Sequence, residues 1–168
     1  MAQAASTNRD NDEPSKALAS GWVNVQEFRV RYSEIDQLGT FYNARALEWF
    51  EMGRTEYLRS IGLPYTQIEA QGVMLPVIEA HLAYQGRAGY DDRLRATTTA
   101  AMIGKARVRF DIRVQHADKA APVVSGYTIH AIVEPSGKPM RPPAWLVDTI
   151  NRYSIATETQ ASPNAEME

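Results

Sequence analysis

The chain has 168 residues, which is enough for one domain with a sizeable hydrophobic core. Its net charge is −2 at pH 7, so the overall charge gives no indication of binding to nucleic acid or to an anionic membrane. The chain contains no cysteine, which excludes disulfides, thiolate metal ligands and a cysteine nucleophile.

The two ends of the chain are polar, and we expect residues 1–21 and 154–168 to be disordered tails around a single domain at residues 22–153. The N-terminal tail lacks the apolar core of a signal peptide, and no stretch approaches the roughly 18 apolar residues of a membrane span. These features predict a cytoplasmic protein that binds neither membranes nor nucleic acid.

The domain is predicted to begin with a strand at residues 22–32, where Phe28, Val30 and Tyr32 alternate onto one face. A helix is predicted over residues 44–62. Its apolar side chains recur every three or four residues and are expected to face a core: Leu47, Phe50, Tyr57, Leu58 and Ile61. Gly62 is suited to end this helix, whereas Gly53 inside it indicates a close backbone contact.

Four further segments have strand character, and turn residues separate them: residues 74–86, 91–104, 105–117 and 121–135. A loop or short helix is expected before them, near residue 65, and a short helix after them, starting near Pro143. One long helix and a run of antiparallel strands predict an α+β fold, in which helix and sheet bury each other.

Several familiar catalytic motifs are missing. The sequence has no glycine-rich phosphate loop, no zinc-protease motif and no nucleophile elbow. Its histidines, His81, His116 and His130, are far apart in sequence, although His81 and His130 can approach each other across a sheet. We therefore expect no metal site and no cofactor.

The segment EIDQLGTFYN, residues 34–43, lies between the first strand and the long helix. The free N–H groups at a helix start can stabilise a developing oxyanion, and a nearby carboxylate can attack a carbonyl or deprotonate water. Gly39 allows the turn that would fold Asp36 back over the helix start. The alternative is purely structural: D-x-x-G is an ordinary turn, and Asn43 is a good N-cap residue.

Residues 31–62 resemble the N-terminal signature of hotdog-fold acyl-CoA thioesterases of the 4-hydroxybenzoyl-CoA thioesterase type. That signature has a strand ending in an aromatic residue, then D-x-x-G, an aromatic turn and a long helix. The helix residues that match are Leu47, Trp49, Phe50, Glu51, Arg54, Glu56 and Leu58. The chain departs from many relatives in having Asn43 where they have histidine, which keeps a backbone donor but no titratable side chain.

The resemblance implies a hotdog fold, an antiparallel sheet of five or six strands wrapped around one central helix. It also implies a homodimer or homotetramer with active sites between subunits. The catalytic carboxylate of the family falls on Asp36, the oxyanion donor falls at or near the backbone N–H of Asn43, and Tyr42 corresponds to an aromatic residue of the same turn. The expected activity is hydrolysis of an acyl-CoA thioester, with Asp36 as nucleophile or general base.

Candidate substrate-binding residues follow from this reading. Gly39, Phe41 and Trp49 lie near the expected acyl site, and Arg107 and Arg109 belong to a basic strand that can receive the phosphates of coenzyme A. The aromatic residues can equally be core, and the arginines can equally be a solvated sheet face. Two other functions remain open: a non-catalytic protein that binds acyl-CoA or an acyl carrier, and a hotdog hydratase or dehydratase.

Overall fold

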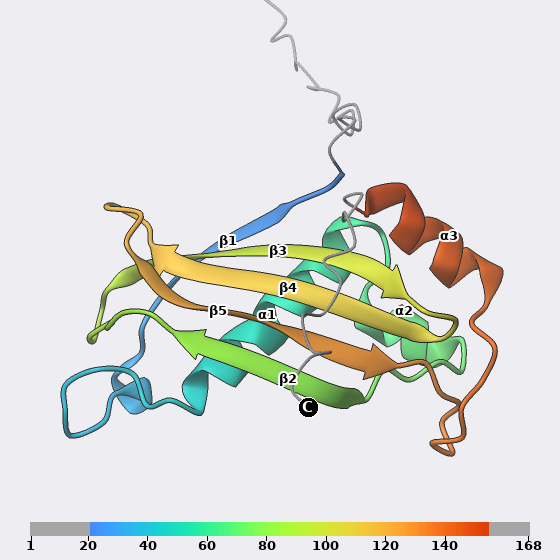
Figure 1. Ribbon diagram of the computed structural model, residues 1–168, viewed down its shortest axis with the longest axis horizontal. Helices are drawn as coiled ribbons and strands as arrows, with labels where there is room; N and C mark the ends of the chain where they lie inside the picture. The colour runs from blue at the N-terminus through green and yellow to red at the C-terminus, as the bar shows by residue number, and fades with distance from the viewer. Residues whose placement is uncertain (1–20, 155–168) are drawn as a thin grey trace, which may run out of the picture.

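The computed structural model describes residues 21–154 and consists of a five-stranded antiparallel sheet wrapped around one long helix (Figure 1). The sheet has the order β1-β3-β4-β5-β2, so β1 and β2 form its two edges. The strands are β1 (Asn24–Arg29), β2 (Val77–Tyr84), β3 (Arg93–Ile103), β4 (Arg107–His116) and β5 (Pro122–Ala131). Nearly all of the predicted tails, residues 1–21 and 154–168, lie outside the described residues.

Within residues 21–154, three α-helices and one 3-10 turn accompany the sheet. The long helix α1 (Arg45–Ser60) is followed, after residues 61–64, by the short helix α2 (Tyr65–Ala70). The third helix, α3 (Ala144–Tyr153), packs beside β3 (Figure 1). The 3-10 turn η1 (Tyr32–Glu34) leads out of the first strand. The predicted α+β hotdog fold is therefore confirmed, and each predicted strand is present but shorter than its predicted segment.

The sheet presents alternate residues to α1. Along β4, Val108, Phe110, Ile112 and Val114 are buried against the helix, as the alternation predicts, while the residues between them face the other way. The residues of α1 that meet this face are Ala46, Trp49, Phe50, Gly53, Tyr57 and Leu58.

Two predictions are wrong about the face that a side chain occupies. Leu47 is 43% exposed, because it lies about 100° around the helix from the buried Ala46, on the solvent side. Tyr32 is 80% exposed, because β1 ends at Arg29 and the 3-10 turn that follows breaks the strand alternation.

Gly53 brings α1 close to the sheet. A Cβ atom added to Gly53 would lie 2.6 Å from the Oγ1 atom of Thr98 in β3, which confirms the predicted close contact. At its other end the helix stops at Gly62, whose φ of +79° suits glycine, and Leu63 N–H donates to the carbonyl of Leu58 (2.9 Å).

Candidate active site

The segment between η1 and α1 forms a closed turn. Ile35 and Phe41 make an isolated antiparallel bridge, Asp36 N–H donates to Thr40 O (2.9 Å), and Gly39 N–H donates to Asp36 O (3.0 Å). Gly39 has a φ of +69°, so the turn uses the conformational freedom that the sequence predicts for this glycine. Asp36 is thereby held at a fixed place beside the start of α1.

The carboxylate of Asp36 is half-buried and only partly engaged. Its Oδ1 atom accepts a hydrogen bond from Leu38 N–H (2.8 Å), which is the usual role of aspartate in a turn. Within residues 21–154, the Oδ2 atom receives no hydrogen bond. One carboxylate oxygen therefore remains available for a substrate or a water molecule.

One backbone N–H group at the start of α1 has no hydrogen-bond acceptor within the described chain. Tyr42 N–H donates to Glu34 O (2.7 Å), and Ala44 N–H donates to the side-chain oxygen of Asn43 (2.9 Å). Between them, the N–H of Asn43 has no acceptor among the described residues. Tyr42 and Asn43 are exposed, so this N–H lies where a ligand can reach it.

The predicted N-cap role of Asn43 is wrong. The N-cap residue is Ala44, which has no side chain that can accept a hydrogen bond from the first turn of the helix. The side chain of Asn43 satisfies the next N–H along the chain instead, one residue before the helix begins.

Glu34 is a buried carboxylate that the sequence reading did not single out. It is 4% exposed, and its two oxygens accept hydrogen bonds from Arg31 N–H (2.6 Å) and from the indole N–H of Trp49 (3.1 Å). A buried carboxylate needs such donors. Glu34 therefore links the turn to α1. The sequence gives no local signal of this contact, because Trp49 lies 15 residues further along the chain.

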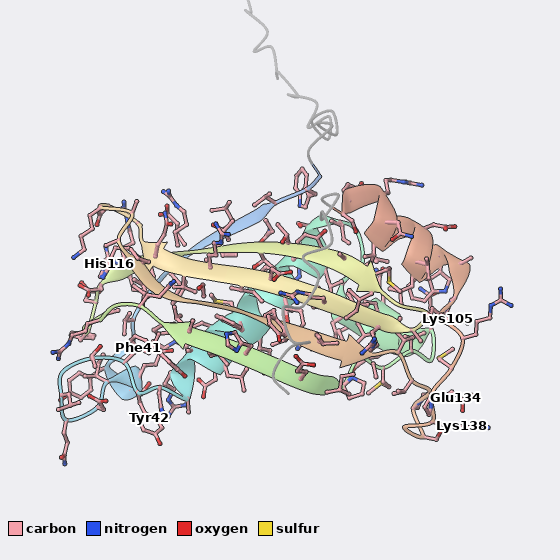
Figure 2. The ribbon with its side chains drawn as sticks, viewed as in Figure 1. Phe41, Tyr42, Lys105, His116, Glu134 and Lys138 are labelled. Carbon is pink, nitrogen blue, oxygen red and sulfur yellow. The ribbon has the colours of Figure 1, made fainter. Side chains whose placement is uncertain are left out.

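The aromatic residues predicted to bind substrate are packed against one another. Phe41 and Trp49 are 5% and 2% exposed, and their ring centroids lie 4.7 Å apart. Tyr84 of β2 stacks on Phe41 at 6.2 Å and donates from its hydroxyl to Asn43 O (2.8 Å). Tyr42, in contrast, is exposed. Figure 2 shows Phe41, Tyr42 and His116 at the same end of the sheet.

The two arginines predicted to bind phosphate do not lie at this turn within one chain. Arg107 begins β4 beside Lys105, at the end of the sheet opposite to Phe41 and Tyr42 (Figure 2). Arg109 faces away from α1, forms a two-oxygen ion pair with Asp111 and stacks 3.8 Å above the ring of Tyr127. The Asp111 carboxylate raises the pKa of Arg109, so this guanidinium is charged and already paired.

The histidines do not form a site together. His81 is exposed and stacks on Tyr127, whereas His130 is buried and pairs with Val77 at the other end of β2. His81 and His130 therefore do not approach each other across the sheet, because His81 lies four positions along β2 from Val77, the residue opposite His130.

His130 belongs to the core. Its Nδ1 atom lies 2.8 Å from Leu75 O, and its Nε2 atom lies 2.9 Å from the hydroxyl of Thr128. A neutral ring satisfies both contacts, donating to the carbonyl and accepting from the hydroxyl. Burial lowers the pKa of His130 to about 4, and the nearby guanidinium of Arg54 acts in the same direction.

The described chain provides no other ligand cluster. Residues 21–154 contain no group of three or more histidine, aspartate or glutamate side chains placed to hold a metal ion. None of the helices in this part of the chain is both long and apolar enough to cross a membrane.

The sequence matches known proteins over most of its length. Residues 30–150 match the family model of the thioesterase-like superfamily. The chain is 40% identical over 63 residues to a putative acyl-CoA thioesterase of Bacillus subtilis, YneP, an alignment that covers 38% of this chain and 46% of the relative. It is 26% identical over 122 residues to a putative esterase of Aquifex aeolicus, covering 73% of this chain and 93% of the relative.

Solved structures have the same fold. A hypothetical protein from Thermus thermophilus superposes with a TM-score of 0.73 at 25% identity, covering 80% of this chain and 99% of the other. A 1,4-dihydroxy-2-naphthoyl-CoA thioesterase from Synechocystis superposes with a TM-score of 0.71 at 22% identity, covering 77% and 96%. The predicted relation to hotdog acyl-CoA thioesterases is confirmed, while the 4-hydroxybenzoyl-CoA type stays a prediction. The chain belongs to the thioesterase-like superfamily.

Proposed function

We propose that this chain hydrolyses acyl-CoA thioesters, with Asp36 as nucleophile or general base and the N–H of Asn43 as oxyanion donor. One observation carries the proposal: a carboxylate with a free oxygen and an N–H without a partner lie at the two ends of one closed turn, at the start of a 16-residue helix. Family membership supports the same reaction.

The reaction follows from these groups. The thioester carbonyl accepts a hydrogen bond from Asn43 N–H, and the positive end of the α1 dipole favours the negative charge that develops on the oxygen. Asp36 then either attacks the carbonyl carbon, giving a mixed anhydride that water hydrolyses, or removes a proton from an attacking water. In both routes the C–S bond breaks, the acyl group leaves as a carboxylic acid, and coenzyme A leaves as a thiol with the released proton.

The other site residues have supporting roles in this proposal. Gly39 allows the turn, and Tyr42 shapes the mouth of the acyl site. The buried rings of Phe41 and Trp49 form its floor. Asn43 contributes its backbone, since an amide side chain cannot exchange a proton with the substrate.

We also propose a homo-oligomer, either a dimer or a tetramer. The edge strand β2 pairs with β5 on one side only, and its side chains Val77, Ile78 and Tyr84 are at least 51% exposed. An unpaired, apolar strand edge favours pairing with another chain. Arg107 and Arg109 are far from Asp36 in one chain, so any contact they make with coenzyme A would belong to the site of a neighbouring subunit.

The relatives point to more than one class of substrate. A Synechococcus elongatus relative, 27% identical over 107 residues, is named a 1,4-dihydroxy-2-naphthoyl-CoA hydrolase. An Arabidopsis thaliana relative, 25% identical over 118 residues, is named an acyl-acyl carrier protein thioesterase. Aromatic and aliphatic acyl groups, on coenzyme A and on an acyl carrier protein, therefore all belong in the first substrate panel.

The test is release of free thiol from this panel at neutral pH. We expect Asp36→Asn to reduce kcat by about a hundredfold or more while thioester binding is kept, because the variant retains size but loses the base. Asp148→Asn on α3 is the matched control and should leave turnover unchanged. Asn43→Ala keeps the backbone donor, so its effect should be much smaller. Normal turnover by Asp36→Asn would reduce Asp36 to a turn residue.

The main alternative is an acyl-CoA-binding protein without activity. Binding of a non-hydrolysable thioether analogue, combined with no thiol release from any thioester, would favour that alternative. Product analysis of an enoyl-CoA incubation tests the hydratase alternative. The positions of His81 and His130 on β2 and β5 do not favour it, while His116 lies at the same end of the sheet as the turn, with its Nε2 atom 2.9 Å from Arg87 O.

A further inference from the structure

The start of α1 depends on a residue from a distant strand. Ala44, the N-cap residue, gives the helix no side-chain cap. Backbone bonds alone hold the first turn: Arg45 N–H donates to Tyr42 O (2.8 Å), Ala46 N–H to Asn43 O and Leu47 N–H to Ala44 O (3.2 Å each). An uncapped first turn tends to fray. The same turn carries the Asn43 N–H that the proposed reaction requires to be fixed.

Tyr84 provides the missing support. Its hydroxyl donates to Asn43 O at 2.8 Å, which is shorter than the helical bond that the same carbonyl accepts from Ala46. On the other side of the turn, Glu34 O accepts the N–H of Tyr42 at 2.7 Å. Arg45 N–H donates to Tyr42 O at 2.8 Å, and Tyr42 O shares its peptide group with the Asn43 N–H. These contacts fix the backbone before and after Asn43 and leave its own N–H unpaired.

The position of the Tyr84 hydroxyl is itself well fixed. The backbone of Tyr84 lies in the β2–β5 ladder opposite Val124, and its ring stacks on Phe41 with an interplanar angle of 28°. The hydroxyl is therefore placed by the β2 backbone and by the buried ring of Phe41. A donor that is placed in advance can orient a flexible turn at little entropic cost.

We propose that Tyr84 is a positioning residue for the thioesterase reaction: its hydroxyl holds the carbonyl of Asn43 so that the free Asn43 N–H points toward the substrate oxygen. This inference rests on the proposed function. Tyr84 does not contact the reacting atoms; it holds the peptide group that joins residues 43 and 44 and thereby limits the backbone rotation of Asn43, which sets the direction of its N–H. Loss of its hydroxyl should slow the chemical step and leave substrate binding almost unchanged.

The test compares Tyr84→Phe with a matched control. The phenylalanine keeps the ring on Phe41 and removes only the hydrogen bond. Tyr90→Phe removes the hydroxyl of another exposed tyrosine, one that forms no hydrogen bond within the described chain. We expect Tyr84→Phe to lower kcat about five- to tenfold, with KM within about twofold and an unchanged melting temperature. Tyr90→Phe should match the wild type.

Hydrogen exchange gives a second readout that a general loss of stability would not produce. The amides of Ala46 and Leu47 should exchange faster in Tyr84→Phe, while amides in the centre of α1 keep their protection. A normal kcat in Tyr84→Phe, or a lowered kcat with unchanged exchange at Ala46 and Leu47, would overturn the inference. A wild-type protein that hydrolyses no thioester would instead refute the proposed function, and the inference with it.

Discussion

Replacing Gly53 by alanine tests how closely α1 packs against the sheet. At an ordinary position inside a helix, alanine is more stable than glycine by about 1 kcal/mol, because glycine loses more backbone entropy on folding. Gly53 is not an ordinary position, since the new Cβ would lie 2.6 Å from Thr98 Oγ1. Thr98 is fully buried and branched at Cβ, so its side chain has little freedom to move away.

The two effects have opposite signs and can be compared. Overpacking of a well-packed core costs about 1–3 kcal/mol, which exceeds the gain of about 1 kcal/mol in helix propensity. We therefore expect Gly53→Ala to lower the free energy of unfolding by up to about 2 kcal/mol. The next atoms that the Cβ would meet, in Ile112, are 3.8 Å away and need no adjustment.

A double-mutant cycle isolates this contact. In a Thr98→Ala background the clashing oxygen is absent, so Gly53→Ala should now raise the free energy of unfolding by up to about 1 kcal/mol. Urea denaturation followed by tryptophan fluorescence measures all four proteins. The reasoning is refuted if Gly53→Ala stabilises the protein that retains Thr98, or if its effect is the same in both backgrounds.

Two further predictions concern the turn and the buried histidine. Gly39→Ala should cost about 1 kcal/mol of stability and lower kcat, because φ is +69° at this position. Gly137→Ala has a φ of +84° and equally open space around it, so it should lose similar stability without losing turnover. Since the pKa of His130 falls from 6.5 to about 4 on folding, the unfolded chain binds a proton that the folded chain does not. The contribution of His130 to the free energy of unfolding should therefore be fully present above about pH 6.5, and up to about 3 kcal/mol of it should be lost as the pH falls to 4. Urea denaturation midpoints measured at each pH test this. The His81→Gln variant should show the same loss, and a flat pH profile would contradict the reasoning.

Local patterns were sufficient to predict most of the fold. The alternation along β4 and the spacing of Phe50, Tyr57 and Leu58 in α1 depend only on which neighbours along the chain share a face, and both were correct. One error, Leu47, lies on the solvent side within α1, and the other arose where a strand ended earlier than its apolar pattern. Tyr32 continues the alternation of β1 in sequence, but the backbone has already turned there.

The candidate site was predictable only in part, for a related reason. The turn at Asp36 and Gly39 is a local feature and was recognisable as such. The contacts that stabilise it are not local: Tyr84 lies 41 residues from Asn43, and the indole of Trp49 meets Glu34 across 15 residues. No periodicity in one sequence encodes which tyrosine hydroxyl meets which carbonyl.

The exposure of the Asn43 N–H has a consequence for assembly. A hydrogen bond to a developing oxyanion is strongest where water is excluded, and in one chain both Tyr42 and Asn43 face solvent. Tyr84 ends the edge strand β2, so a second chain paired along β2 would lie beside the same turn that Tyr84 supports. The apolar edge and the uncapped helix start are thus adjacent features, and pairing there would both bury Val77 and Ile78 and shield the proposed oxyanion site. We therefore expect assembly and turnover to depend on the same strand.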